Sequence, residues 1–424
     1  MKSRWVLFDL DGTLTRSEEG IWNCVRHTAR TMGLPVPDDK ELREFIGPPL
    51  TYSFKKYMGM TDEQAAKALE IYRERYTSVG LFENRVYPGV RNVLRILRRA
   101  GVKMGIVTGK PENSTVRILE HFGLKRYFDT VVCATGEHAE KDQLILRALP
   151  EDHGEAWMVG DRCFDMEGGV RTGLRTIGAG WGYGTEEELR KSGAEFVAGK
   201  PEDIAEIICP GAEKPEGAFI AVEGLDGSGK GTQIRMLTDT LDRYGFEVVG
   251  SREPGGSPIG EKIRDILLDR ENSEMTAETE ALLYAASRAQ HVREVIRPAV
   301  TAGKTLICDR FVDSSVAYQG GGRQLGVDRV LAINAPALDG TLPDAAVYLD
   351  IGYRESLSRR RAATEPDRLE MENDSFYSRV EEAYHQLISR DPGRFIVVSA
   401  VGDPERIAAE IAEKVLALLM EAED

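Results

Sequence analysis

Short, mostly apolar runs alternate with longer amphipathic stretches along the whole chain. Runs of this length, separated by helical patterns, are typical of buried parallel strands in α/β units. We therefore predict two three-layer α/β domains with parallel sheets. The predicted strands cover residues 5–8, 102–107, 156–159, 218–222, 305–308 and 345–349.

Two segments interrupt this rhythm and divide the chain. Residues 16–86 are polar with helical spacing, which predicts a helical insertion. Residues 209–217, with the sequence CPGAEKPEG, contain two prolines, two glycines and three charges ahead of a new strand pattern. The 424 residues are enough for two or three domains. We predict one domain over 1–208, a linker over 209–216 and a second domain over 217–424.

The composition predicts a cytoplasmic protein that does not enter membranes. Hydrophobic residues make up 42% of the chain and charged residues 29%, as in soluble globular proteins. The first residues run directly into a strand pattern without an export signal. The five cysteines are scattered and form no C-x-x-C pair, so neither a disulfide framework nor a zinc site is indicated.

The net charge of −15 opposes binding to a nucleic-acid backbone. Any bound polyanion should therefore be small and held in a local basic pocket. This favours nucleotides and other small phosphates as partners over DNA or RNA.

Two aspartates, Asp9 and Asp11, follow the first predicted strand. Side chains alternate along a strand, which predicts that both carboxylates point to the same side. Such a pair can divide the work between a nucleophile on phosphorus and an acid for the leaving oxygen.

Three further elements that suit phosphate chemistry follow in order. Thr108 and Gly109 open a turn whose hydroxyl and N–H groups suit phosphoryl oxygens. Lys141 supplies a positive charge. Asp161 and Asp165 provide the hard oxygen ligands that magnesium prefers.

These elements, taken in order, resemble the haloacid dehalogenase superfamily of phosphatases over residues 1–208. The resemblance implies an aspartyl phosphate on Asp9, with Asp11 as general acid and base. It also implies that Thr108 and Lys141 steady the phosphoryl group. The implied magnesium ligands are Asp9, the Asp11 backbone carbonyl and Asp161, with Asp165 supporting the metal or Lys141.

The insertion at 16–86 resembles the helical cap of the phosphoglycolate phosphatase and 5'-nucleotidase branch, and residues 45–50 resemble its substrate-facing loop. The sequence leaves the substrate open. It also leaves a second reading, in which this half is a non-catalytic docking or regulatory module. The intact aspartates and Lys141 argue against that reading.

The second domain opens with a glycine-rich loop between a strand and a helix. Backbone N–H groups of such a loop wrap a phosphate chain, and Lys230 reaches the β and γ oxygens. This predicts ATP or GTP as ligand. Gly231 stands where a Ser or Thr normally touches magnesium, although Thr232 follows. The predicted loop residues are Gly224, Leu225, Asp226, Gly227, Ser228, Gly229, Lys230, Gly231 and Thr232.

A GTPase switch was the alternative, but the chain has no N-K-x-D motif for guanine. Instead, REPGGS at 252–257, EALLYAASRAQ at 280–290 and DRFVDSSVAYQG at 309–320 resemble thymidylate kinases over 217–424. The resemblance implies phosphorylation of dTMP by ATP with magnesium, and a homodimer formed through this domain.

The implied acceptor site combines aromatic, cationic and amide side chains. Tyr284 would stack on thymine, and Arg288 would donate to a base carbonyl. Arg264 and the catalytic Arg310 would bind the dTMP phosphate. The remaining assignments are Ser315 and Gln319 to the base, Tyr318 to the 2' position, Glu253 and Asp226 to the sugar and phosphate region, and Asp309 to the metal shell.

A mobile lid over ATP is implied at about residues 354–375, around Asp367-Arg368-Leu369-Glu370 and the run Arg359-Arg360-Arg361. The loop carries Ser228 rather than an arginine before Gly229, so an arginine from the lid is expected to meet the charge that develops on the γ-phosphoryl group. The spacing leaves open which of the three arginines does so.

Overall fold

The computed structural model describes residues 2–46, 50–135, 140–361, 368–369 and 371–423. The chain folds as two units, residues 1–213 with 243–245 and residues 214–242 with 246–424. Each contains one parallel sheet between helices, which confirms the predicted fold class. Several predicted residues lie outside the description, namely 47–49 of the loop at 45–50, Asp367 and Glu370 of the lid, and the side chain of Arg361.

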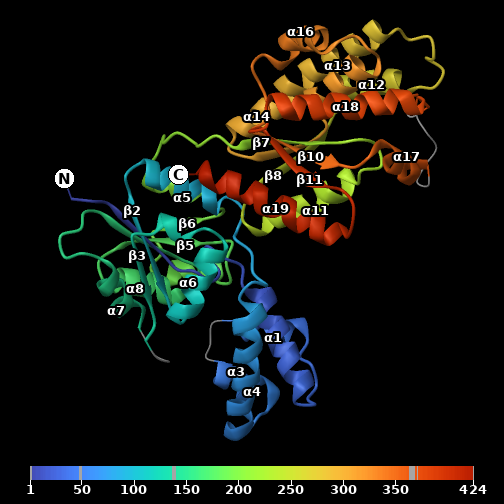
Figure 1. The fold of residues 1–424 in the computed structure, drawn as a ribbon. Coiled ribbons are helices and arrows are strands. Elements are labelled where there is room, and N and C mark those ends of the chain that lie inside the picture. Colours follow the sequence, from blue (N-terminus) through green and yellow to red (C-terminus); the bar gives the residue numbers. More distant parts are fainter. Residues whose placement is uncertain (1, 47–49, 136–139, 362–367, 370, 424) are drawn as a thin grey trace. The chain divides into compact units, whose positions relative to one another are not determined.

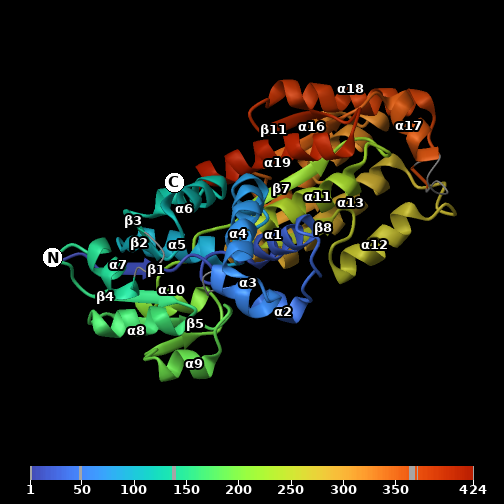
Figure 2. The same ribbon diagram turned by 90° about the horizontal axis from the view of Figure 1, so that it is seen from below.

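The sheet of unit 1 has the order β3-β2-β1-β4-β5-β6. Val6 and Phe8 pack with α5, α6 and α10 on one face, while Leu7 and Met158 pack with α7 on the other. Figure 2 shows α8 and α9 beside β4 and β5. The elements are β1 Trp5–Phe8, β2 Lys103–Thr108, β3 Thr130–Cys133, β4 Ala156–Gly160, β5 Arg175–Ala179, β6 Phe196–Ala198, α5 Val90–Arg99, α6 Glu112–His121, η2 Lys125–Tyr127, α7 Lys141–Ala148, α8 Cys163–Arg171, α9 Glu186–Lys191 and α10 Glu202–Ile208.

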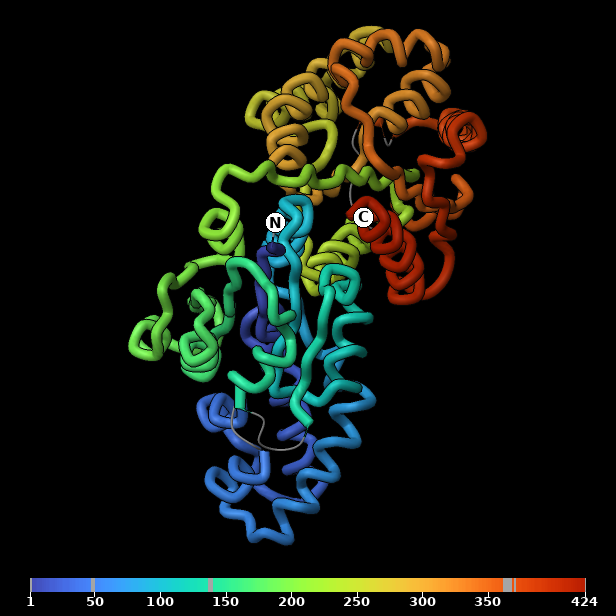
Figure 3. Tube along the Cα trace, turned by 90° about the vertical axis from the view of Figure 1, so that its left-hand side faces the viewer, coloured from blue at the N-terminus to red at the C-terminus, as the bar shows by residue number. Residues whose placement is uncertain are grey.

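The insertion between β1 and α5 is a helical bundle with its own small core, built around Phe45, Phe54 and Tyr72 (Figures 1 and 3). Thr61 begins α4 through a capping box, in which its hydroxyl accepts the Gln64 N–H and the Gln64 side chain accepts the Thr61 N–H. The elements are α1 Glu18–Thr31, α2 Asp39–Arg43, α3 Leu50–Met58, α4 Asp62–Arg75 and the π-helix η1 Tyr76–Gly80.

The sheet of unit 2 has the order β11-β10-β7-β9-β8. Figure 1 shows α13, α16 and α18 on one side of this sheet and α11 and α19 on the other. The strands are β7 Ala218–Glu223, β8 Val248–Arg252, β9 Thr305–Asp309, β10 Ala345–Asp350 and β11 Phe395–Ser399. The helices are α11 Lys230–Arg243, α12 Pro258–Leu268, α13 Ala277–His291, η3 Val292–Ile296, α14 Arg297–Thr301, α15 Val312–Ser315, η4 Val316–Gly322, α16 Val327–Leu338, α17 Tyr353–Arg361, α18 Asp374–Arg390 and α19 Pro404–Glu421.

Residues 209–217 form neither helix nor strand between α10 and β7. Among the described helices, none combines the length and the apolar character that crossing a membrane requires.

Candidate active sites

Three carboxylates meet at the carboxyl end of the sheet in unit 1. Asp9 follows β1, Asp161 follows β4, and Asp165 lies in the first turn of α8. One oxygen from each lies within 4.8 Å of the others. The strand β1 ends at Phe8, and the Asp9 N–H still donates to the Val159 carbonyl of β4 at 2.9 Å. That Asp9 and Asp11 point to the same side stays a prediction.

Lys141 joins this cluster from the first residue of α7. Its Nζ atom lies 2.6 Å from Asp9 Oδ1 and 2.6 Å from Asp165 Oδ1. The side chain is largely buried, so both ion pairs are shielded from solvent. The structure thus brings together the lysine and the aspartates that the sequence analysis selected.

The buried position of the cluster disfavours the ionised forms of its carboxyl groups. Burial raises the pKa of Asp9 to about 7 against the opposing charge of Lys141, and the charge of Asp165 adds to the rise. Burial, with the charges of Asp9 and Asp165, raises the pKa of Asp161 to about 8. A divalent cation would favour the ionised forms of these groups. Three carboxylate groups at this spacing therefore fit magnesium.

Gly12 allows the turn after β1 to pass close to the cluster. Its φ is +88°, and a Cβ at this position would lie 2.2 Å from Asp161 Oδ2. The neighbouring Thr13 hydroxyl donates to Asp161 Oδ1 at 3.2 Å. Glycine is therefore required at this point of the D-x-D-G-T motif.

Asp11 has a partner that the sequence analysis missed. Lys110 Nζ lies 2.8 Å from Asp11 Oδ2 and donates to the Tyr76 hydroxyl at 2.7 Å. The buried Thr108 hydroxyl accepts the Lys110 N–H at 3.2 Å, and the exposed Gly109 lies between them. Lys110 stands in the turn selected for Thr108, which was the available sequence indication.

Unit 2 contains a cavity of about 660 Å³ beside its glycine-rich loop. The lining draws on β8, β9, α12, α13 and η4 as well as the loop. The predicted loop residues that the lining does not include, Gly224, Leu225 and Ser228, are buried. The predicted residues that line the cavity are Asp226, Gly227, Gly229, Lys230, Gly231, Thr232, Glu253, Arg264, Tyr284, Arg288, Asp309, Arg310, Ser315, Tyr318, Gln319, Arg359, Arg360 and Leu369.

Lys230 begins α11 at the end of the loop, and its buried Nζ donates to the carbonyls of Gly224 and Leu225, each at 3.1 Å. Burial lowers its pKa, and the charge of Arg310 acts in the same direction. The site therefore holds a desolvated cation within the loop.

Arg310 occupies the left-handed region with φ 71°, a conformation that non-glycine residues rarely adopt. Its guanidinium group lies 2.5 Å from Asp226 Oδ1 and donates to the Tyr318 hydroxyl at 3.2 Å. Burial raises the pKa of Asp226, but the charges of Arg310 and Lys230 outweigh this effect and hold the pKa below its usual range. Backbone strain of this kind is concentrated at functional sites.

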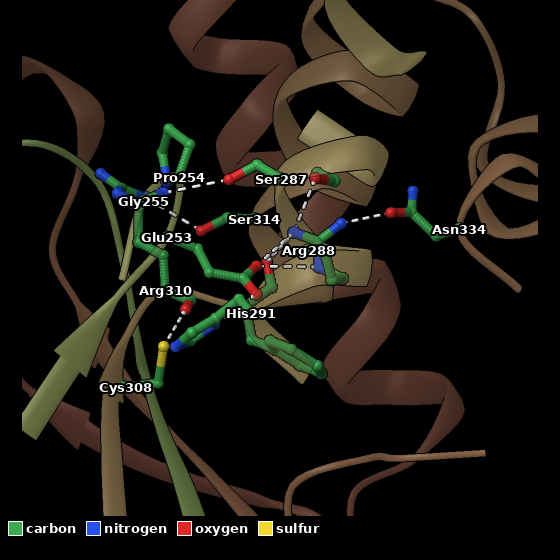
Figure 4. Close-up of polar contacts among 12 residues, drawn as sticks. Glu253, Pro254, Gly255, Ser287, Arg288, His291, Cys308, Arg310, Ser314 and Asn334 are labelled. Carbon is green, nitrogen blue, oxygen red and sulfur yellow. Dashed lines mark hydrogen bonds and ion pairs between the residues drawn. The ribbon is translucent and has the colours of Figure 1, made fainter. Parts of the chain in front are cut away.

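Glu253 and Arg288 form a buried ion pair (Figure 4). Glu253 Oε2 accepts from Arg288 Nε at 2.8 Å, and Glu253 Oε1 lies 2.9 Å from His291 Nδ1. These contacts hold Arg288 in place. Glu253 also lines the cavity, and its assignment to the sugar and phosphate region stays a prediction.

Three further residues accept hydrogen bonds from Arg288. Its Nη2 atom donates to the Phe311 carbonyl at 3.2 Å and to the Ser315 hydroxyl at 3.1 Å, and its Nη1 atom donates to Asn334 Oδ1. His291 Nε2 lies 2.6 Å from Ser251 Oγ. The sequence reasoning missed Asn334, His291 and Ser251. His291 follows Arg288 by three residues on one helix face, which was the available indication.

Arg264 on α12 is held by the backbone of the segment that precedes this helix. Arg264 Nη1 donates to the Pro254 carbonyl at 2.8 Å, next to the cis Glu253–Pro254 peptide bond. Arg264 therefore enters the cavity from a fixed support.

Helix α17, which lies within the predicted lid, packs directly on the glycine-rich loop. Ser356 is buried and donates to the Asp226 carbonyl. A Cβ on Gly227 would lie 2.5 Å from the Ser356 carbonyl oxygen and 3.1 Å from the Arg360 nitrogen. Arg359 donates to the Ala400 carbonyl at 3.0 Å and pairs with Glu355.

The oxygen groups in this cavity also fit magnesium. Asp309 Oδ1 is buried and has no hydrogen-bond partner among the described residues. Gly231 provides no side chain, but Thr232 lines the cavity beside it. An unpaired carboxylate oxygen at this depth is a suitable ligand for a hard cation.

Comparison with known proteins matches each of the two units to a protein family. Residues 222–411 match the family described as thymidylate kinase. The thymidylate kinase of Halothermothrix orenii is 48% identical over 207 residues, which cover 48% of this chain and 99% of that protein. The enzyme of that name from Bacillus pumilus is 46% identical over 197 residues, covering 46% and 93%. Residues 6–179 match the family described as haloacid dehalogenase-like hydrolase.

The chain joins a haloacid dehalogenase-like hydrolase to a member of the thymidylate kinase family.

Solved structures similar to the hydrolase unit include a haloacid dehalogenase-like hydrolase from Streptococcus pneumoniae, 30% identical, covering 48% of this chain and 98% of that chain with a TM-score of 0.44. A predicted phosphatase from Clostridium acetobutylicum is 36% identical, covering 49% and 99% with a TM-score of 0.44. The Asp9 cluster lies in the hydrolase unit, and the cavity around Lys230 and Arg310 lies in the thymidylate kinase unit. The protein is an enzyme with two phosphoryl-transfer units.

Proposed function

We propose that the thymidylate kinase unit converts dTMP to dTDP with ATP and magnesium, and that the hydrolase unit cleaves a small phosphate monoester. The observation that carries the first proposal is a single cavity lined by the phosphate-binding loop and by Tyr284, Arg288 and Gln319. A site for the phosphates of ATP and a site for the base of dTMP in one cavity suit transfer of a phosphoryl group between the two nucleotides.

On the donor side, N–H groups of the glycine-rich loop bind the phosphates of ATP, and Lys230 meets the β and γ oxygens. Asp309 would help to hold magnesium, which would neutralise further phosphate charge. Arg310 and Arg264 bind the phosphate of dTMP through guanidinium forks. These residues hold the two phosphates in position for direct transfer.

On the acceptor side, Tyr284 stacks on the base, while Arg288, Ser315 and Gln319 form hydrogen bonds with it. Tyr318 crowds the 2' position, which disfavours ribonucleotides. We also propose a homodimer formed through this unit, as in the family that it resembles.

In the hydrolase unit, a carboxylate oxygen of Asp9 attacks phosphorus, and Asp11 gives a proton to the departing alcohol. Asp11 then removes a proton from the water that hydrolyses the aspartyl phosphate. Thr108, Gly109 and Lys141 bind the phosphoryl oxygens. The buried cluster of Asp9, Asp161 and Asp165 around Lys141 supports catalysis over a purely regulatory unit.

The acceptor proposal predicts a ranking of substrates. Assays of the full chain with ATP and dTMP, dUMP, UMP or AMP should give dTMP the highest kcat/KM. The missing methyl of dUMP should cost about 1–3 kcal/mol, whereas the clash or unpaired donor with UMP and AMP should cost more. A preference for UMP or AMP would contradict the assignment.

The lid proposal concerns the run of three arginines that ends α17. We propose that one of Arg359, Arg360 and Arg361 meets the charge on the γ-phosphoryl group; Arg359 and Arg360 both line the cavity. Its alanine variant should lower kcat by a factor on the order of 10² or more, with a much smaller change in KM for dTMP. Steady-state kinetics of the three single alanine variants measure the difference.

The exposed Arg354, on the same helix, provides the matched control, because its alanine variant should keep full kcat. The proposal of a lid arginine fails if alanine at 359, at 360 and at 361 each leaves kcat unchanged.

A further inference from the structure

Glu280 on α13 is a buried carboxylate to which neither the sequence motifs nor the proposed mechanism gives a role. Its side chain is 1% exposed. Gln319 Nε2 donates to Glu280 Oε1 at 2.9 Å, and Arg323 donates to both oxygens at 3.1–3.2 Å. Arg368 Nη2 lies 2.8 Å from Glu280 Oε2. Glu280 is therefore surrounded by donors from η4 and from the two arginines.

These donors keep Glu280 ionised. Burial raises the pKa of its carboxyl group, but the hydrogen bonds and charge of Arg323, with Gln319 and Arg368, outweigh burial and lower the pKa below its ordinary value. An ionised carboxylate accepts hydrogen bonds and cannot donate them. Glu280 consequently presents acceptor oxygens only.

This property determines which way the Gln319 amide points. The oxygen and nitrogen of a glutamine amide are easily exchanged in assignment, and the hydrogen-bond network must decide between them. Since Glu280 only accepts, the NH₂ group of Gln319 must face it. The carbonyl oxygen then points the other way.

Gln319 lines the acceptor cavity together with Tyr284 and Ser315. Its Oε1 atom is buried and has no hydrogen-bond partner among the described residues. An unpaired buried acceptor is costly, so a ligand that brings a donor to this oxygen gains affinity over one that does not.

We propose that Glu280 is a positioning residue for base specificity, because it fixes Gln319 with its carbonyl oxygen toward the base. The inference rests on the proposed binding of dTMP. Thymine carries an N3–H donor that suits this oxygen. Cytosine carries a lone pair at N3, which would face a second acceptor and leave both unpaired.

Two nucleotides isolate this effect in the full chain. Deoxythymidine 5'-monophosphate and 5-methyl-deoxycytidine 5'-monophosphate share the sugar, phosphate and 5-methyl group, and differ at N3 and position 4. The measured quantity is the kcat/KM value for deoxythymidine 5'-monophosphate divided by that for 5-methyl-deoxycytidine 5'-monophosphate. Glu280→Gln places an amide opposite Gln319 that both donates and accepts, so the Gln319 amide is free to turn over. The ratio should fall by about tenfold.

Glu372→Gln provides the matched control. Glu372 pairs with the same Arg323 on its other side but makes no hydrogen bond with Gln319 in the structure described. Its ratio should stay at the wild-type value. A purely structural role for Glu280 would lower kcat/KM for both nucleotides by a common factor and leave the ratio unchanged, which would overturn the proposal.

A double-mutant cycle shows whether Glu280 acts through Gln319. Gln319→Met removes both polar atoms at similar size, so adding Glu280→Gln should change the ratio no further. An equal change in both backgrounds would overturn the proposal. Gln319→Met alone should also lower the ratio. Thermal unfolding shows whether Glu280→Gln folds. If it does not, the test rests on Gln319→Met, and an unchanged ratio in that variant overturns the proposal.

The experiments distinguish failure of the proposed dTMP kinase function from failure of the proposed role of Glu280. A wild-type protein that does not phosphorylate dTMP would remove the premise. A wild-type dTMP kinase whose ratio is unaffected by both variants would refute the role of Glu280 alone.

Discussion

Replacing Lys230 with alanine is expected to lower kcat for dTMP phosphorylation by a factor of about 10² or more. Lys230 is buried at the end of the glycine-rich loop, where its ammonium group is fixed by two carbonyls at 3.1 Å. A preorganised charge in a site with little water contributes far more to a charged transition state than the same charge in solvent. A coupled assay of dTDP formation at saturating dTMP and ATP measures the change.

The loss should not reflect unfolding. Burial lowers the pKa of Lys230, so the folded state holds its charge at a cost that alanine removes, and thermal unfolding of the variant checks that it remains folded. Lys414→Ala is the control, because Lys414 is exposed and pairs only with Glu410 and a carbonyl among the described contacts. A Lys230→Ala protein with near wild-type kcat would remove the assignment of the loop.

The strands that sequence patterns predicted include the central strand of each sheet, and those missed lie mostly at the sheet edges. β1, β4, β7, β9 and β10 are apolar runs that begin and end close to their predicted bounds. The edge strands β3, β6, β8 and β11 were not predicted. One side of an edge strand meets solvent, as the exposed Phe196 and Val397 show. The short β6 and the strand β8 lack a continuous run of four apolar residues, whereas β11 begins with Phe-Ile-Val-Val and was missed although it has such a run.

The candidate site residues that the sequence analysis selected belong to short motifs, either at strand ends, such as Asp9 and Asp161, or on one helix face, such as Tyr284 and Arg288. Those that it missed act through partners far away in the chain. Glu280 meets Gln319 across 39 positions, and Lys110 meets Tyr76 across 34. No local spacing links such pairs, because tertiary packing alone brings them together.

Glu253 lies in a recognised motif, but its partners could not be predicted from local spacing either. Its place after β8 indicated the acceptor site, and it does line the cavity. The sequence did not show that His291 and Arg288 occupy both of its oxygens. Residue type and position predicted a place near the ligand, and only the packed side chains reveal that Glu253 also supports Arg288.

Asp9→Asn is expected to lower hydrolysis of p-nitrophenyl phosphate by a factor on the order of 10³ or more. The substitution nearly preserves volume but removes the nucleophilic charge from a cluster that also includes Asp161 and Asp165. It should also weaken magnesium binding by the hydrolase unit, because one hard ligand is lost. Phosphate release and calorimetric titration with magnesium measure the two effects.

Stability should not decline in this variant. Burial raises the pKa of Asp9 to about 7, so its ionised form is disfavoured in the fold, and asparagine removes that cost. Lys141 keeps its ion pair with Asp165 at 2.6 Å. Asp152→Asn is the control, because Asp152 is exposed in the same unit and should leave hydrolysis unchanged.

The same variant tests whether the two activities are independent. All described residues that line the kinase cavity belong to unit 2, so Asp9→Asn should keep dTMP phosphorylation within about twofold of wild type. Lys230→Ala should spare hydrolysis for the corresponding reason. Persistent hydrolysis in Asp9→Asn would exclude Asp9 as the nucleophile. A severalfold slower kinase in a variant that remains folded by circular dichroism would show instead that the two sites are coupled.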